Sequence, residues 1–461
     1  MQQTSIAIVG SGISGLAAAW LLRARYRVTV FEAGAYAGGH TNTVDVELDG
    51  VRAPVDTGFL VFNERTYPNL IALFDHLGVA SVTSEMSFSV RMEDERLEWA
   101  GTSIGALFAQ KRNLVNPRFW RMLGDIRRFN RSAPALLERA DAAHYSLGEF
   151  LAEERYSREF CDWYLLPMAA AIWSCPMHAM REFPAASFVR FFVNHGLLQI
   201  TRRPRWMTVV GGGREYVRRL LDGLDDVRLA SPVTAVRRLP QSVEVVSGGR
   251  VEQFDQIILA AHADQSLALL DDADARERAL LGAVCYQPNA AWLHTDREFL
   301  PVSPRAWAAW NYTGRSASSN AGTGAAAANE ADATAAGSVS VTYLINKLQP
   351  LPMSTPVLVT LNPHRPIASD KVIRQIAYAH PVFDAAALAA QQRLSTIQGV
   401  RRTWFCGAWT GYGFHEDGLK SAMAVSESLG VRAPWVDAGA PVAAEVAMQP
   451  PPSGPRLVRA A

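Results

Sequence analysis

Cysteine is scarce in this chain of 461 residues, and the two charge signs nearly cancel. The four cysteines are widely spaced and form no CxxC pair: Cys161, Cys175, Cys285 and Cys406. This usage excludes a disulfide-built scaffold and fits free thiols in a reducing compartment. Cys175 and His178 stand three residues apart, but no second ligand pair follows, so a metal site is not expected.

The near-zero net charge of +1 gives no reason to expect a nucleic-acid partner. Long apolar runs are missing too, because no stretch reaches the roughly 18 uncharged residues that span a bilayer. The longest, residues 164–176, is too short and contains Pro167. The N-terminus also lacks the basic region of a signal peptide. We therefore expect a cytoplasmic, globular protein that touches a membrane only from its surface.

The first 32 residues carry the pattern of a dinucleotide-binding unit. Residues 6–9 are typical of a buried strand, Gly10, Gly12 and Gly15 follow with GxGxxG spacing, and a helix is expected over 13–25. The glycines permit a tight turn, close approach of a pyrophosphate and close helix–strand packing, while the helix N-terminus attracts the diphosphate. Glu32, after a second strand, is placed to accept both ribose hydroxyls. The alternative is a glycine-rich turn that holds no ligand.

Further glycine-rich runs recur along the chain, at Gly38-Gly39, at Asp56-Thr57-Gly58 and at residues 211–213. Near the end, residues 403–406 are typical of a strand, and a helix opens around Asp417-Gly418 and runs to about residue 429. A second helix N-terminus directed at the ligand is what a large, two-ended cofactor would use.

The order of these segments predicts an α/β fold with a discontinuous, Rossmann-like nucleotide-binding domain and a second, α+β substrate domain. The nucleotide domain is expected to comprise residues 1–78, 205–270 and 395–432, and the substrate domain residues 79–204 and 271–394. Within these ranges, 104–200 is expected to be mainly helical and 227–236 to form a strand. Two segments are too poor in apolar residues to order themselves, a flexible insertion at 314–337 and a disordered tail at 433–461.

Together these blocks resemble the flavin-containing amine oxidase superfamily, which includes phytoene-desaturase-like enzymes. The resemblance spans nearly the whole ordered chain and implies FAD as the cofactor, bound without a covalent link. It also implies that Val233 contacts adenine through its backbone and that the isoalloxazine lies between Gly38-Gly39 and the last helix. The positions that it assigns to FAD are Gly10, Gly12, Ser14, Gly15, Glu32, Gly38, Gly39, His40, Thr41, Asp56, Gly58, Val233, Gly407, Asp417, Gly418 and Leu419.

A narrower resemblance is to a bacterial subgroup found alongside cyclopropane fatty acyl phospholipid synthases. It is carried by the runs at residues 58–63, 361–363, 380–381 and 413–418. By association, this likeness implies an acyl chain of a phospholipid as the substrate, and a lipid methyltransferase as a partner.

The chain departs from the superfamily at several informative positions. His40 stands where arginine usually follows the paired glycines, and Ala408 replaces the glutamate of a Gly-Glu pair. Amine oxidases place a tyrosine of their aromatic cage where this chain has His415, which weakens an amine reading. We expect His415 to face the flavin as a catalytic group, and Lys347 to hold a water near the flavin. The alternative for His40 and His415 is that each is an ordinary loop or helix-start residue whose side chain bonds to backbone.

Residues 107–131 combine seven basic side chains with a single acid, Asp125, interleaved with aromatic residues. Such a basic, amphipathic segment is how peripheral proteins sit on anionic lipid. The alternative is a solvated basic face over a buried stripe.

These observations predict an FAD-dependent oxidoreductase that oxidises or desaturates a lipid-like acyl chain by hydride transfer to flavin N5, at the inner membrane surface. Two alternatives remain open at this point: an amine oxidase acting on a small amine, and a non-catalytic flavoprotein that assists a lipid-modifying enzyme.

Overall fold

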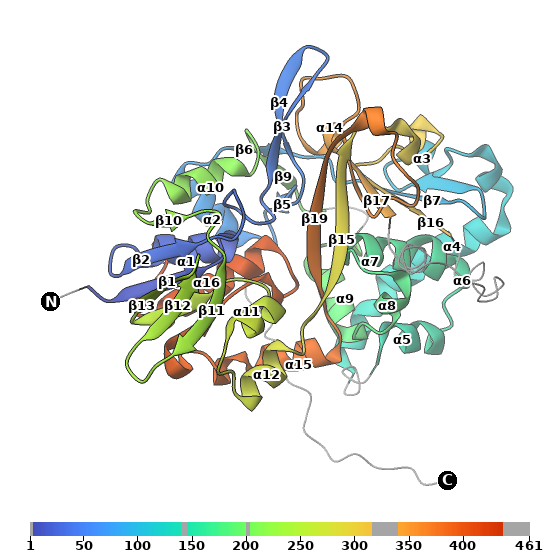
Figure 1. Ribbon diagram of the computed structural model, residues 1–461. Coiled ribbons are helices and arrows are strands. Elements are labelled where there is room, and N and C mark those ends of the chain that lie inside the picture. The colour runs from blue at the N-terminus through green and yellow to red at the C-terminus, as the bar shows by residue number, and fades with distance from the viewer. Residues whose placement is uncertain (1–2, 140–144, 200–202, 316–339, 437–461) are drawn as a thin grey trace, which may run out of the picture.

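The computed structural model describes residues 3–139, 145–199, 203–315 and 340–436. Two regions are visible, one around a parallel sheet near the N-terminus and one around a larger sheet flanked by short helices (Figure 1). No helix within the described ranges is long and apolar enough to cross a membrane.

The parallel sheet of the first region draws its strands from distant parts of the chain. Its order is β10 (Val227–Arg228), β2 (Arg27–Phe31), β1 (Ser5–Val9), β14 (Gln256–Leu259) and β20 (Thr403–Phe405). Every neighbouring pair in it is parallel. The carboxyl ends of β1, β2 and β14 therefore meet at one edge, which is where ligands bind in open α/β sheets.

Each face of this sheet packs on its own layer because successive strand residues point to opposite sides. Ile6 and Ile8 pack with the helices α1 (Ile13–Leu22), α2 (Pro68–Leu77), α10 (Arg214–Leu221) and α16 (His415–Ser428). Ala7 and Val9 pack on the opposite layer. That layer contains β11 (Val233–Arg238), β12 (Val243–Ser247), β13 (Arg250–Phe254), α11 (Ala263–Leu269), α12 (Ala275–Leu281) and α15 (Ala385–Arg393).

The second region is built on a seven-stranded mixed sheet. Its order is β19 (Val372–Val382), β15 (Cys285–His294), β18 (Leu358–Leu361), β17 (Ser340–Leu344), β16 (Trp310–Gly314), β7 (Phe88–Met92) and β8 (Leu97–Ala100). Helical segments pack beside it: α3 (Ile104–Leu107), η1 (Lys111–Val115), α4 (Pro117–Ser132), α5 (Leu147–Glu153), α6 (Arg158–Phe160), η4 (Cys161–Leu165), α7 (Leu166–Trp173), α8 (Met177–Arg181), α9 (Ala185–Asn194) and α14 (Ile345–Leu348).

Short strands lie between the two regions. One hairpin is β3 (Thr43–Leu48) with β4 (Val51–Asp56), and a small antiparallel sheet joins β5 (Phe62–Asn63), β9 (Trp206–Val209) and β6 (Ser81–Thr83). The chain therefore passes repeatedly between the regions, and the domain boundaries given above stay a prediction.

Two expectations from the sequence need correction. The strand expected over 227–236 is two strands in different sheets, β10 and β11, separated by a turn in which Ala230 has φ +48°. The boundary of the disordered tail, expected at residue 433, is placed too early in the chain. Ala433 and Trp435 are buried, and Trp435 packs on Trp20 and His76. The remainder of that tail, and the expected insertion beyond residue 315, lie outside the described residues.

Candidate active site

A cavity of about 1250 Å³ runs between the two regions and is lined by residues from both. A pocket for one drug-sized ligand occupies roughly 300–1,000 Å³, so this cavity has room for a large cofactor and a second molecule beside it. One exposed end is lined by Ala33, Gln265 and Ala268, beside the parallel sheet. The other exposed end is lined by Thr83, Glu85, Gly101, Thr102, Arg203 and Arg205, in the second region.

The glycine loop after β1 forms part of the cavity wall. A Cβ on Gly10 would lie 2.7 Å from the carbonyl oxygen of Ala260, and a Cβ on Gly15 would lie 1.9 Å from that of Gly10. These two glycines are therefore required by packing. Gly12 differs, because a Cβ there would meet nothing within 4 Å. Its backbone faces open space in the cavity, where a diphosphate can approach the N-terminus of α1.

Glu32, at the end of β2, is held in a defined orientation. Its Oε2 accepts hydrogen bonds from the backbone N–H and the Oγ of Ser11, at 3.0 and 2.5 Å, and its Oε1 accepts from the N–H of Gly34 at 2.7 Å. These three bonds use both lone pairs of Oε2 and one of Oε1, so one acceptor site remains, on Oε1, and Glu32 lines the cavity. Glu32 can therefore accept one ribose hydroxyl at Oε1 without losing a bond, whereas the sequence predicted that it accepts both. Val233, at the start of β11, also lines this end.

The paired glycines bring a second backbone segment against the first. Gly38 and Gly39 have φ of +120° and +58°, and a Cβ on Gly39 would lie 3.2 Å from the Cα of Gly12. Further along, a Cβ on Gly58 would lie 2.2 Å from the carbonyl oxygen of His40. These glycines line the cavity, and a flat ligand can pass close to their backbone because no Cβ intervenes.

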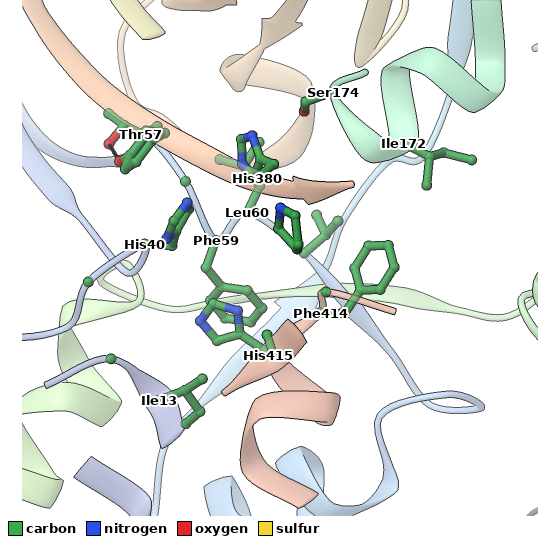
Figure 2. A pocket seen from close by; sticks show the side chains of 18 of the residues that line it. Ile13, His40, Thr57, Phe59, Leu60, Ile172, Ser174, His380, Phe414 and His415 are labelled. Carbon is green, nitrogen blue, oxygen red and sulfur yellow. Dashed lines mark hydrogen bonds between the residues drawn. The ribbon is translucent and has the colours of Figure 1, made fainter. Parts of the chain in front are cut away.

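His415 begins α16 and points into the cavity. Its imidazole stacks on Phe59, with ring centroids 3.8 Å apart (Figure 2). Its Nε2 lies 2.9 Å from Oγ1 of Thr41. Burial lowers the pKa of His415 to about 3, so the ring is neutral at pH 7. Thr41 does not line the cavity itself but fixes the imidazole, and also bonds the phenol of Tyr216 at 2.5 Å.

A cluster of rings surrounds His40, a second histidine that lines the cavity. The rings of His40 and His380 have centroids 5.2 Å apart (Figure 2). His40 also stacks on Tyr378, with centroids 4.7 Å apart. His262 is 6.4 Å from His40. Burial lowers the pKa of His40 well below its ordinary value, and the neighbouring histidines lower it further. Its Nε2 has no hydrogen-bond partner among the described residues, so one buried polar atom remains for a ligand to satisfy.

Several residues assigned to FAD support the site from outside the cavity. Asp56 accepts hydrogen bonds from Thr43, from the N–H of Gly213 and from Gln349, and burial raises its pKa to about 6. Its carboxylate oxygens are therefore already hydrogen-bonded to other groups of the protein. Asp417 likewise accepts from the N–H groups of Tyr412 and Phe414 at 3.0 Å and fixes the loop before α16.

Close packing between two helices explains Gly418. A Cβ there would lie 2.8 Å from Oγ of Ser14 and 2.9 Å from Ile13. Gly418 thus lets α16 cross α1 so that both helix N-termini lie at the cavity. Ser14 lines the cavity, whereas Leu419 is fully buried in the core below. Gly407 lines the cavity, and its N–H donates to Oγ of Ser421 at 2.9 Å.

Lys347 does not line the cavity. Its Nζ donates to both carboxylate oxygens of Glu85, at 2.9 and 3.1 Å, at the exposed end. The expected role of holding a water at the flavin therefore has no geometric support.

The wall of the second region is formed mainly by rings and apolar chains. They are Phe88, Trp99, Tyr164, Met168, Ile172, Phe191, Leu197, Trp206, Trp310, Tyr343 and Leu361. Tyr164 lies in the π-helical turn η4, a local distortion that is frequent at functional sites. Burial raises the pKa of its phenol to about 12, and the nearby Arg203 guanidinium opposes that shift.

The sequence alone did not single out His262, Tyr286 or Tyr378 as wall residues. His262 and Tyr286 stack with centroids 4.2 Å apart, and the Tyr286 phenol accepts from the N–H of Ala263 at 3.0 Å. They come from the end of β14 and the start of β15. The one available signal was the position of His262 three residues after a buried strand whose carboxyl end meets the nucleotide site.

The residues present fit FAD. An open glycine position at a helix N-terminus suits the diphosphate, the oriented carboxylate suits the ribose, and the glycine-lined wall suits a flat ring system. These features, the parallel sheet and the room for a second molecule beside the cofactor define an FAD-dependent oxidoreductase. The model of the family described as flavin containing amine oxidoreductase matches residues 13–345. The chain belongs to this family, whose members bind FAD.

Solved structures share the fold at low sequence identity. The fatty acid isomerase from P. acnes that produces CLA is 16% identical, with a TM-score of 0.62 over 93% of this chain and 99% of that one. A putrescine oxidase variant is 17% identical, with a TM-score of 0.64 over 93% and 98%. Cyclohexylamine oxidase from Brevibacterium oxydans IH-35A is 16% identical, with a TM-score of 0.62 over 93% and 100%. No curated protein matches the chain in sequence.

Proposed function

We propose that the protein oxidises or desaturates the acyl chain of a lipid-like substrate. The observation that carries this proposal is the composition of the cavity in the second region, where apolar and aromatic side chains from several elements form the wall. A long, uncharged chain is bound by such a wall through burial of apolar area, about 25 cal/mol per Å².

The charges along the cavity favour the same class of substrate. Glu85 is paired with Lys347, and Arg205 with Glu64 at 3.3 Å. Arg203 lines the exposed end, donates to the carbonyl oxygen of Gln199, and makes no ion pair within the described ranges. A guanidinium there suits the carboxylate or phosphate at the polar end of an acyl chain.

Among the described residues, the carboxylates that line the cavity are Glu32 and Glu85, so the wall near Gly58 and His415 offers none to a cationic amine. The family comparison keeps an amine as the rival substrate, since putrescine oxidase and cyclohexylamine oxidase share the fold. In the family's amine oxidases, the position of His415 carries a cage tyrosine, and this chain lacks it.

Bound FAD would supply the two-electron chemistry, accepting a hydride at its isoalloxazine. This chain's residues would hold the diphosphate at Gly12, the ribose at Glu32 and the acyl chain against the aromatic wall. Burial lowers the pKa of His415 to about 3 and that of His380 to about 4, and lowers the pKa of His40 well below its ordinary value. These imidazoles therefore face the cavity as neutral polar groups, and the surrounding rings exclude water.

The likeness of residues 58–63 and 413–418 to proteins found with cyclopropane fatty acyl phospholipid synthases supports a phospholipid acyl chain as the particular substrate. It also supports a lipid methyltransferase as the partner, and the cytoplasmic face of the membrane as the location. The rival without chemistry is a flavoprotein that only assists such a partner.

Anaerobic mixing of the FAD-loaded protein with detergent-dispersed phospholipids, and separately with a panel of small amines, tests the proposal. We expect loss of the oxidised flavin absorption with the lipid and no loss with the amines. Bleaching of the flavin by a simple amine would contradict this proposal and show that the protein is an amine oxidase. Flavin that no substrate reduces, in a protein that co-purifies with a methyltransferase, would replace it with the non-catalytic role.

A further inference from the structure

Large apolar side chains are exposed on the outer surface of the second region. Ile104 is 80% exposed, Leu114 50%, Val115 83% and Trp120 51%. They belong to α3, η1 and the start of α4, on the side of the molecule away from the N-terminal sheet (Figure 1). Four such residues within a 17-residue segment are unusual for a surface that faces only water.

Specific contacts hold this segment together. The indole N–H of Trp120 donates to the carbonyl oxygen of Leu114 at 2.8 Å, and the Trp120 ring lies 5.6 Å from that of Phe108. Phe108 in turn bonds through its N–H to the carbonyl oxygen of Ile104. Other residues of α4, Phe119, Met122 and Phe129, point into the core. The exposed side chains therefore project from a segment that these contacts hold in place.

The same surface carries basic side chains that no acidic side chain among the described residues pairs with. Arg118 is paired with Glu95 and Glu159, and Arg128 with Asp125. Lys111, Arg112, Arg127 and Arg131 are exposed and form no ion pair within the described ranges. Trp120, Arg127 and Arg131 share one face of α4, since they are seven and four residues apart.

This surface adjoins the exposed end of the cavity. Gly101 and Thr102 line that end, and Ser103 caps α3 by accepting from the N–H of Ala106. Ile104 follows at once, so a layer bound to the apolar residues would lie next to the opening used by Arg203.

We infer that residues 104–131 form a docking surface for a bilayer containing anionic phospholipid. Trp120, Val115 and Ile104 insert into the interface while Lys111, Arg112, Arg127 and Arg131 contact lipid phosphates. The inference rests on the proposed function only in that the acyl substrate would enter from the same membrane.

Vesicle co-sedimentation of the FAD-loaded protein tests this surface directly. Vesicles of phosphatidylcholine and phosphatidylglycerol in equal parts are compared with phosphatidylcholine alone. We expect at least about tenfold tighter binding to the anionic vesicles, weakened by salt. Val115→Asp should reduce that binding about tenfold or more, and so should Arg127→Gln combined with Arg131→Gln. Val251→Asp, at a 53% exposed valine in the other region, is the matched control and should bind like the wild type.

Equal binding by Val115→Asp and the wild type would overturn the inference, and so would absence of binding to anionic vesicles. If Val115→Asp instead converts a dimer to a monomer in light scattering, the surface is an interface between copies and the inference fails. The same measurements distinguish a failure of this inference from a failure of the proposed function. A protein that binds vesicles but is not reduced by any lipid keeps this surface and loses the proposed substrate.

Discussion

The two ends of the cavity are built from different material. At the nucleotide end much of the wall is backbone, because a Cβ on Gly10, Gly38 or Gly58 would stand within 3 Å of a carbonyl oxygen. At the substrate end the wall is made of side chains, such as Met168 and Ile172, packed on a core of their own. A backbone wall tolerates few residue types, whereas a side-chain wall can be rebuilt without disturbing the fold. Cofactor and substrate binding should therefore be separable by mutation.

The largest effect is expected from Gly15→Ala. The added Cβ would stand 1.9 Å from a carbonyl oxygen, so we expect destabilisation by about 3 kcal/mol together with loss of flavin. Gly12→Ala is the matched variant, because its Cβ meets no protein atom within 4 Å. It should unfold at the wild-type temperature yet bind FAD poorly. Thermal unfolding of the apoproteins and flavin content after gel filtration measure both. A Gly15→Ala protein with normal stability and full flavin would contradict the backbone-wall account.

Glu32→Gln should weaken FAD binding without changing the fold. Loss of the charge at this bonded carboxylate is expected to raise the Kd for FAD about 10- to 100-fold, because hydrogen bonds to charged groups contribute roughly 1.5–3 kcal/mol. Flavin fluorescence titration of the apoprotein measures it. Glu47→Gln, at an exposed glutamate of β3, is the control and should leave the Kd unchanged. Equal affinities would show that Glu32 supports the loop but does not reach the ribose.

His415→Gln tests the buried wall between the two ends. The folded pKa of about 3 lies below the unfolded value of 6.5, so between these values the unfolded chain binds more protons and the wild type loses stability as pH falls. Removing His415 should remove about 2 kcal/mol of that loss at about pH 5. Urea unfolding at neutral and acidic pH measures it, with His178→Gln, at an exposed histidine, as the control. Asp56 and Asp417, whose pKa values burial raises to about 6, act in the opposite direction in both proteins. An unchanged pH slope in His415→Gln would show that the imidazole is not held neutral.

Met168→Trp should affect the substrate end alone. The larger side chain fills the lined space, so we expect kcat/KM for the acyl substrate to fall about tenfold or more while flavin content stays normal. Met168→Leu conserves volume and should keep most of the activity. If Met168→Trp lowers flavin content and substrate use together, the two ends are coupled and the comparison fails.

The smallest effect is expected from Lys347→Met. The lysine is paired with Glu85 at the exposed end and does not line the cavity, so the change should cost about 0–1 kcal/mol and alter kcat less than about twofold. Stopped-flow flavin reduction measures it. A tenfold fall in the reduction rate would restore the catalytic role that the sequence suggested.

The sequence predicted the fold of the nucleotide end and its cofactor because each element there is dictated locally. The β1–α1 turn, Glu32 and the paired glycines have fixed spacings. The resemblance to a flavin family then extended the expected FAD site to the start of α16. Asp56 was assigned to FAD from such a motif, but the bonds it makes to Gly213 and Gln349 depend on segments far along the chain. His262 reaches the wall from beyond the end of β14, and its only local signal is its place after that buried strand. Tyr378 reaches the wall from β19, and no local pattern marks it. The substrate end depends on packing between distant helices and strands, which a single sequence does not encode in any short spacing.

The most direct test of the account is anaerobic reduction of the bound flavin. The FAD-loaded wild type is mixed with phosphatidylglycerol in detergent, or with putrescine or cyclohexylamine, and the oxidised flavin band is followed. The account predicts bleaching by the lipid, its loss in Met168→Trp at unchanged flavin content, and no bleaching by either amine. Bleaching by an amine, with none by the lipid, would contradict it.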